Sequence, residues 1–149
     1  MLNSQIQILP YQEHYQQEIV VLMESIAQEF AEPISTNRIT KKVLLPDFYL
    51  VALVENKLVG TISITRLEKG NSVLRKMFLD KNYRGQGIAV LLLQNIVNWA
   101  NDNNVNSIYL GTMAQFTRAQ KFYESLNFKQ IDKERLPNDF PLNPIDSIF

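Results

Sequence analysis

The stretch that decides the fold spans residues 74–93 and reads LRKMFLDKNYRGQGIAVLLL. Its pattern predicts a strand, a short basic glycine turn and then a strongly apolar helix. Gly85 and Gly87 have no Cβ, so the backbone there can turn sharply and approach a ligand closely. The helix directs its unpaired N–H groups and its positive dipole end at the turn, and Arg84 adds a full charge. The stretch therefore predicts an anion site, and the natural anion is a phosphate.

Composition limits the classes of protein to be considered. The chain has 149 residues with 15 basic and 15 acidic side chains, and it contains no cysteine and a single histidine. We expect one domain over residues 1–149. Its neutral charge argues against a nucleic-acid partner, and no apolar run approaches the roughly 20 residues that would span a membrane. The residue types exclude thiolate and histidine-rich metal centres, and they fit a cytoplasmic protein without a metal. We expect a monomer or a homodimer.

The first half of the chain predicts three strands and two helices. Alternation over residues 5–9 indicates a first strand, and apolar residues at three- and four-residue steps indicate a helix over residues 12–31. A shorter helix is expected over residues 35–45. The apolar run 48–54 predicts a buried strand, which a turn at residues 55–57 joins to an antiparallel strand over 58–65.

The second half predicts a strand–helix–strand unit followed by further elements. A strand over residues 73–79, a helix reaching about residue 101 and a strand over 107–112 form a right-handed unit with parallel strands. We expect a helix over residues 117–126, a sixth strand over 128–132 and a last strand over 145–149. The sum is a mixed α/β sheet with helices on both faces.

Two common nucleotide-binding fingerprints do not fit the glycine turn. The dinucleotide pattern G-x-G-x-x-G/A would need Gly or Ala where this chain has Val90. The phosphate loop G-x-x-x-x-G-K-[ST] is absent. Taken alone, residues 84–87 are equally compatible with a plain tight turn.

Two motifs in register resemble the GNAT-type N-acetyltransferase family. Residues 84–89, RGQGIA, match that family's Q/R-x-x-G-x-G/A signature, and residues 119–128, AQKFYESLNF, are similar to its A-x-x-F-Y-x-x-x-G-F segment. The resemblance covers nearly the whole chain. It implies a central, mixed, mostly antiparallel twisted sheet of about six or seven strands, with strands four and five parallel and about four helices on both faces.

The resemblance implies that the donor is acetyl-CoA. The backbone amides of residues 85–89 would hold its pyrophosphate, with Arg84 and Gln86 beside it, and the pantetheine arm would lie along the fourth strand. An N–H near Phe78 or Leu79 would hold the carbonyl oxygen as negative charge develops. The implied cofactor-binding residues are Met77, Phe78, Leu79, Arg84, Gly85, Gln86, Gly87, Ile88 and Ala89.

Tyr123 is the catalytic residue that the resemblance implies. A phenol with an ordinary pKa near 10 carries its proton at neutral pH and is suited to protonate the departing thiolate. Outside the motif, the same residue would be read as a half-buried aromatic side chain of a helix. The lack of cysteine favours direct transfer in a ternary complex over a covalent intermediate.

Three positions depart from the family pattern. Phe116 stands where an Asn often contacts the cofactor arm, and Asn127 replaces a usual Gly in a geometry that Asn tolerates. The fourth strand offers Arg75 and Lys76 where many members carry an acidic base. The base is then Glu29, Glu24 or a chain of water molecules, or the acceptor arrives already deprotonated.

The acceptor is expected to be a primary amine of a small molecule or a peptide. The family builds this site from the first helices and late loops, which here supply Glu29 and Phe30, and the carboxylates favour a cationic amine. The alternative function is a non-catalytic sensor or interaction module that binds CoA or acyl-CoA. A third is a related acyltransferase that uses a longer acyl group or another nucleophile.

Overall fold

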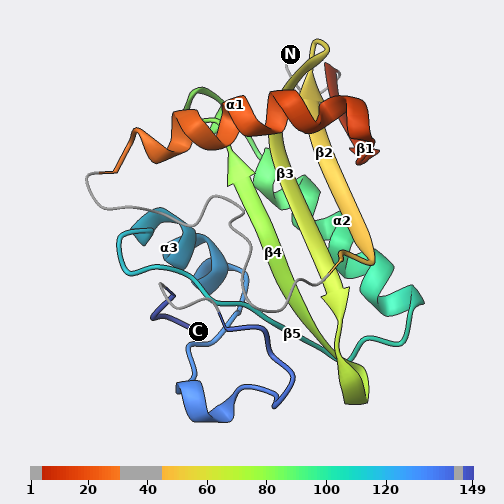
Figure 1. The fold of residues 1–149 in the computed structure, drawn as a ribbon, viewed down its shortest axis with the longest axis vertical. Coiled ribbons are helices and arrows are strands. Elements are labelled where there is room, and N and C mark those ends of the chain that lie inside the picture. Colours follow the sequence, from red (N-terminus) through yellow and green to blue (C-terminus); the bar gives the residue numbers. More distant parts are fainter. Residues whose placement is uncertain (1–4, 31–44, 143–145) are drawn as a thin grey trace.

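A five-stranded mixed sheet forms the centre of the molecule (Figure 1). The computed structural model describes residues 5–30, 45–142 and 146–149. The strands lie in chain order across the sheet, with β1–β2, β2–β3 and β3–β4 antiparallel and β4–β5 parallel. Their bounds are β1 Ile6–Pro10, β2 Phe48–Val54, β3 Lys57–Arg66, β4 Asn71–Leu79 and β5 Ser107–Tyr109.

The hairpin between β2 and β3 forms at the predicted turn. Glu55 and Asn56 have φ values of 51° and 67°, so two consecutive residues adopt the left-handed conformation. That geometry matches the right-handed twist of the two flanking strands and fixes their register. The hairpin thus places β3 against β4, the strand that leads into the glycine turn.

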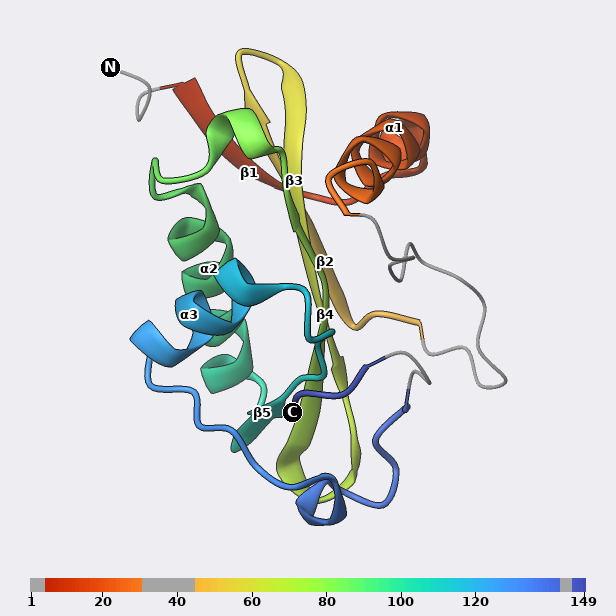
Figure 2. The ribbon, with the colours of Figure 1, turned by 90° about the vertical axis from the view of Figure 1, so that its left-hand side faces the viewer.

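Within the described residues, three α-helices cover the two faces of the sheet (Figure 2). Helix α1 (Gln16–Ala27) packs on one face, and α2 (Ile88–Asp102) and α3 (Thr117–Ser125) lie on the other. Each face has its own apolar core, because alternate strand residues point to opposite sides. Short 3-10 turns occur at Glu13–Tyr15, Glu68–Gly70, Lys81–Tyr83 and Lys133–Arg135.

The sheet topology confirms the parallel fourth and fifth strands, but the expected six or seven strands and four helices are wrong for the described residues. The segment over residues 128–132 is not a strand, because within the described residues its backbone makes one bond to a distant segment, from Ile131 N to Phe149 O. Its other backbone bonds are local, from Phe128 N to Tyr123 O and from Arg135 N to Asp132 O. The expected last strand is reduced to an isolated bridge between Thr112 and Ile148. The expected helix over residues 35–45 falls almost wholly on residues 31–44, outside the described part.

Helices α2 and α3 agree closely with their predicted ranges, and α1 is shorter than predicted. Helix α1 ends at Ala27 rather than at residue 31, and a 3-10 turn precedes it. Asn127 has a φ of 71°, which confirms the left-handed geometry inferred at that position. In the described part of the chain, no helix combines the length and apolar character needed to cross a membrane.

Helix α2 allows a matched test of the core. Leu92 is 0% exposed and Leu91 is 37% exposed. The substitution Leu→Ala therefore removes fully buried apolar surface at residue 92 and partly exposed surface at residue 91. We expect L92A to lower the free energy of unfolding by about 2–5 kcal/mol, because it removes buried methyl groups and leaves a cavity. The control L91A should cost less than about 1 kcal/mol. Urea unfolding followed by circular dichroism measures both, and equal losses would contradict the assigned face of α2.

Candidate functional site

The glycine turn connects β4 to α2 through two left-handed residues. Gly85 and Gly87 have φ values of 76° and 84°, and α2 begins at the next residue, Ile88. An added Cβ at either glycine would meet nothing within 4 Å, so glycine is required there for conformation and not for packing. The space beside the turn is open to a ligand.

The first residue of α2 is fixed by burial of its side chain, while the first N–H groups of the helix have no partner within it. The side chain of Ile88 is fully buried, and the N–H of Leu91 donates the first helical bond to the Gly87 carbonyl. The earlier N–H groups of the helix have no helical partner, and the dipole makes this end positive. Gln86 Oε1 is buried without a hydrogen-bond donor among the described residues. The free N–H groups and the positive helix end suit a bound anion, whereas Gln86 Oε1 is an acceptor and does not contribute to binding it.

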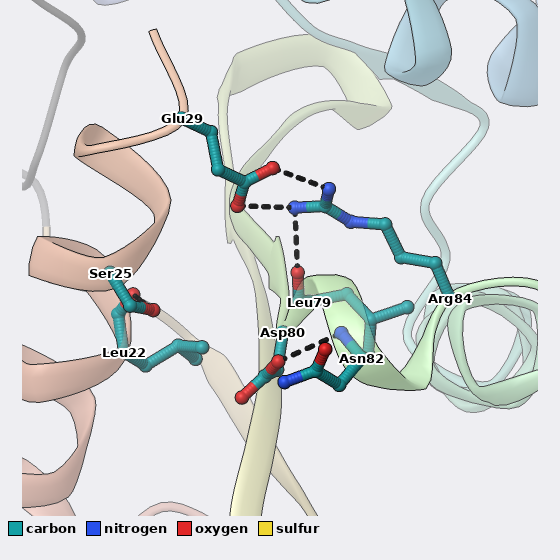
Figure 3. A network of polar contacts seen from close by, with 7 residues as sticks. All are labelled: Leu22, Ser25, Glu29, Leu79, Asp80, Asn82 and Arg84. Carbon is teal, nitrogen blue, oxygen red and sulfur yellow. Dashed lines mark hydrogen bonds and ion pairs between the residues drawn. The ribbon is translucent and has the colours of Figure 1, made fainter.

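The guanidinium of Arg84 is held by other groups of the protein. Its guanidinium makes a bidentate ion pair with Glu29, at 2.7 Å and 3.1 Å, and it also donates to the Leu79 carbonyl at 3.0 Å (Figure 3). The side chains of Arg84 and Glu29 are 24% and 18% exposed. The pair ties the segment after α1 to the end of β4. The carboxylate predicted for the acceptor site and the charge predicted for the phosphate therefore contact each other.

A cleft of about 430 Å³ lies between β4, the glycine turn and α3. It collects residues from three parts of the chain that are far apart in sequence. The lining residues already expected from the sequence are Met77, Phe78, Leu79, Arg84, Gly85, Ala89, Tyr123, Glu29 and Phe30. Gln86, Gly87 and Ile88 belong to the adjoining turn and helix start.

The cleft also has lining residues that the sequence analysis did not single out. Ile26 comes from α1, and Arg118 and Phe122 come from α3. Phe122 is adjacent to Tyr123 in the motif segment, and Arg118 lies one helical turn before Phe122. Helical periodicity around Tyr123 is therefore the signal that points to both of them.

Tyr123 closes the inner wall of the cleft. The residue is 8% exposed and its ring contacts Phe122 and Phe128. Burial raises the pKa of the Tyr123 phenol above its ordinary value. The proton is therefore retained throughout the neutral range, and the group can serve as a donor but not as a resting-state base.

The α1 side of β4 carries a different set of groups. Lys76 has a φ of 57° at an irregularity in the β3–β4 register, and its Nζ lies 5.7 Å from the centre of the Tyr49 ring. Burial, with the charge of Arg75, lowers the pKa of Lys76 to about 8. Tyr49 stacks on Tyr11 with ring centres 4.5 Å apart. This side of the sheet therefore presents aromatic rings and cations.

Sequence and structure comparisons agree with this geometry. The profile of the Acetyltransferase (GNAT) family matches residues 12–128. This chain is a member of the GNAT acetyltransferase family. A crystal structure of a GNAT-family acetyltransferase from Staphylococcus aureus Mu50 is similar, with a TM-score of 0.83 and 29% sequence identity over 96% of this chain and 95% of that chain.

Two curated relatives show how far the similarity of this GNAT chain extends. N-acetylaspartate synthetase of Xenopus tropicalis is 44% identical over 84 residues, which are 56% of this chain and 31% of that protein. N-alpha-acetyltransferase 30 of Schizosaccharomyces pombe is 29% identical over 128 residues, 83% of each chain. This chain thus spans about a third of the length of the N-acetylaspartate synthetase that it matches.

The Arg84–Glu29 pair can be tested against a looser one. A double-mutant cycle with E29Q and R84Q should give a coupling energy of about 1 kcal/mol, because the pair is bidentate and mostly shielded from water. The control is Lys57–Asp80, which is 3.9 Å long with Lys57 59% exposed, and its coupling should be near zero. Urea unfolding measures both cycles, and similar values would mean that the pair contributes no more than a surface contact.

Proposed function

We propose that this GNAT chain is an N-acetyltransferase that moves the acetyl group of acetyl-CoA directly to a primary amine in a ternary complex. The observation that carries the proposal is the single cleft that joins the end of β4, the glycine turn and Tyr123. These parts supply, in one place, a strand edge, an anion site and a buried proton donor. A thioester with a phosphate-bearing arm requires that combination.

The donor is held mainly by backbone groups. The N–H groups of residues 85–89 receive the pyrophosphate at the positive end of α2, which has 15 residues and a full dipole. Arg84 is paired with Glu29. Because the Glu29 carboxylate neutralises its charge, Arg84 adds little to the attraction of the phosphates. The open space beside both glycines supports this placement of the phosphates.

The pantetheine arm lies along Met77, Phe78 and Leu79. The pairing of β4 with β5 stops at Val73 and Tyr109, so beyond that point β5 no longer covers this edge of β4. An amide-containing arm can pair there as an added strand would. The N–H of Phe78 or Leu79 then holds the thioester oxygen, where such a preorganised donor contributes about 3 kcal/mol to the barrier reduction.

The chemistry is a direct acyl transfer. The amine nitrogen attacks the thioester carbon, the C–N bond forms, and the C–S bond breaks as Tyr123 gives its proton to the sulfur. The raised pKa of Tyr123 keeps that proton in place before reaction. The absence of cysteine from all 149 residues supports transfer without a cysteine-bound intermediate.

The names of the two relatives support an amine acceptor. One is a synthetase of N-acetylaspartate and the other is an N-alpha-acetyltransferase, and both names place the acetyl group on nitrogen. The ion pair between Glu29 and Arg84 weakens the argument for a cationic amine that rested on the Glu29 carboxylate. Phe30 remains on the wall of the cleft and contacts the ring of Phe116.

The phosphate site predicts a binding defect in a folded protein. A Leu side chain in place of Gly87 would strain a residue with a φ of 84° and fill the open space beside the turn. We expect G87L to weaken CoA binding at least tenfold, about 1.4 kcal/mol, by isothermal titration calorimetry. The control V90L changes an exposed residue of the same helix and should bind CoA normally. Normal binding by folded G87L would refute this phosphate site.

The acid role predicts a defect in turnover and not in binding. Y123F keeps the buried ring and removes the proton donor, so kcat should fall on the order of 100-fold while the Kd for CoA stays unchanged. The control Y15F removes a hydroxyl on the α1 side of the sheet. Thiol release from acetyl-CoA with a panel of amines measures turnover. Tight CoA binding without thiol release by the unmodified chain would instead support a non-catalytic CoA-binding module.

A further inference from the structure

Acetyl transfer needs a group that removes a proton from the amine, and the candidates considered from the sequence are poorly placed for that task. Both carboxylate oxygens of Glu29 accept hydrogen bonds from Arg84. Glu24 is an exposed residue of α1. On β4, Arg75 and Lys76 are cations at neutral pH and occupy the strand where a carboxylate was expected.

The C-terminal segment brings another carboxylate, that of Asp146, close to the backbone that follows β5. Residues 146–149 are fastened to Thr112 by three backbone hydrogen bonds, including Thr112 N to Ile148 O at 2.8 Å and Ser147 N to Thr112 O at 3.0 Å. Asp146 Oδ2 would lie 3.0 Å from a Cβ placed on Gly111. The absence of a side chain at Gly111 therefore allows the Asp146 carboxylate to approach the backbone that follows β5.

Gly111 lies where β4 and β5 separate. The parallel register pairs Val73 with Tyr109, and continuing it by two residues sets Gly111 level with Arg75. The positive charge of Arg75 acts on Asp146, which agrees with that placement. No ion pair or hydrogen bond of the Asp146 carboxylate is formed within the described ranges, so its oxygens are available there.

Arg75 and the proposed acid lie on opposite sides of the sheet. Tyr123 belongs to the core that packs under α2. Arg75 follows Leu74 of that core, so its side chain points to the other face, where its partner Ser63 pairs with Tyr49. Figure 2 shows the blue segment that ends at residue 142 on that same side of the sheet, with α1.

The environment of Asp146 suits a base. Burial raises the pKa of Asp146 to about 6, and the charge of Arg75 limits the increase. The carboxylate is therefore ionised at neutral pH, and it is a stronger base than an exposed aspartate. Among the described residues, the titratable groups on this face include Arg75, Lys76, Tyr49 and Tyr11, which stacks on Tyr49. Burial lowers the pKa of Lys76 to about 8 and raises that of Tyr49, so neither group titrates near 6.

We propose that Asp146 is the general base that accepts the proton of the attacking amine, an assignment that rests on the acetyl-transfer function proposed above. As the C–N bond forms and the C–S bond breaks, one amine proton passes to the Asp146 carboxylate and the Tyr123 proton passes to the sulfur. After the amide and CoA leave, the carboxylic acid loses one proton to solvent and the phenolate takes one back.

The test is the pH profile of kcat/KM for the acceptor, measured by thiol release with saturating acetyl-CoA. The probe is the fastest amine among aspartate, glutamate, spermidine and a tetrapeptide with a free N-terminus. In the unmodified chain the rate should rise as the pH increases through about 6, because the carboxylate must be ionised to accept a proton. D146N should lose this rise and lower kcat on the order of 100-fold at neutral pH.

Three further variants separate a base from a merely structural role. R75Q removes the charge that stabilises the ionised carboxylate, so the rise should move to higher pH. D132N changes an exposed aspartate of the same C-terminal region and should leave both rate and profile unchanged. D146E retains a carboxylate and should keep the rise near pH 6, even if D146N proves unstable.

The outcomes distinguish the two proposals. An active chain whose D146N variant keeps its rate, or keeps the rise near pH 6, overturns the role of Asp146 alone. The same holds if the unmodified chain is active and shows no rise near that pH. A chain that binds CoA and releases no thiol with any amine overturns the transfer function itself, and the base assignment with it.

Discussion

The separation of β4 from β5 is the constraint on which the rest of this structure depends. Parallel pairing joins only three residue pairs, from Asn71 to Val73 on β4. Beyond them β4 contains Lys76 in a left-handed conformation and continues to Leu79 against β3 alone. Backbone groups inside a protein need hydrogen-bond partners, so an edge opened in mid-sheet favours an amide-bearing ligand. The proposed donor arm, acid and base are all placed relative to this opening.

The distribution of charge follows from a second, long-range contact. Arg84 and Glu29 neutralise each other across 55 residues of sequence, and Arg84 also binds the last carbonyl of β4. The glycine turn is left to attract anions through its N–H groups and the α2 dipole. Because the pair joins the end of α1 to the turn, the helix on the proposed acceptor side and the proposed phosphate site are mechanically connected.

Local elements were predictable where periodicity and turn chemistry decide them. The apolar run 48–54 coincides with β2, and the apolar helix after the turn begins at Ile88 as expected. The segment 128–132 shows the limit of this reasoning, because its composition suits a strand but a strand also needs a partner along its length. Here the chain offers it little beyond one bond, from Ile131 to Phe149. Strand pairing is a tertiary property that a local pattern does not contain.

By itself, the sequence determined the glycine turn, the helix behind it and the register of two motifs, and these are enough to indicate the family. They are local, because a residue with positive φ and a helix start depend on neighbouring residues. Only the tertiary structure decided that Arg84 meets Glu29 and that Asp146 lies against Gly111. Charge pairs and proton transfers depend on distance in space, and folding sets that distance between residues that are remote along the chain.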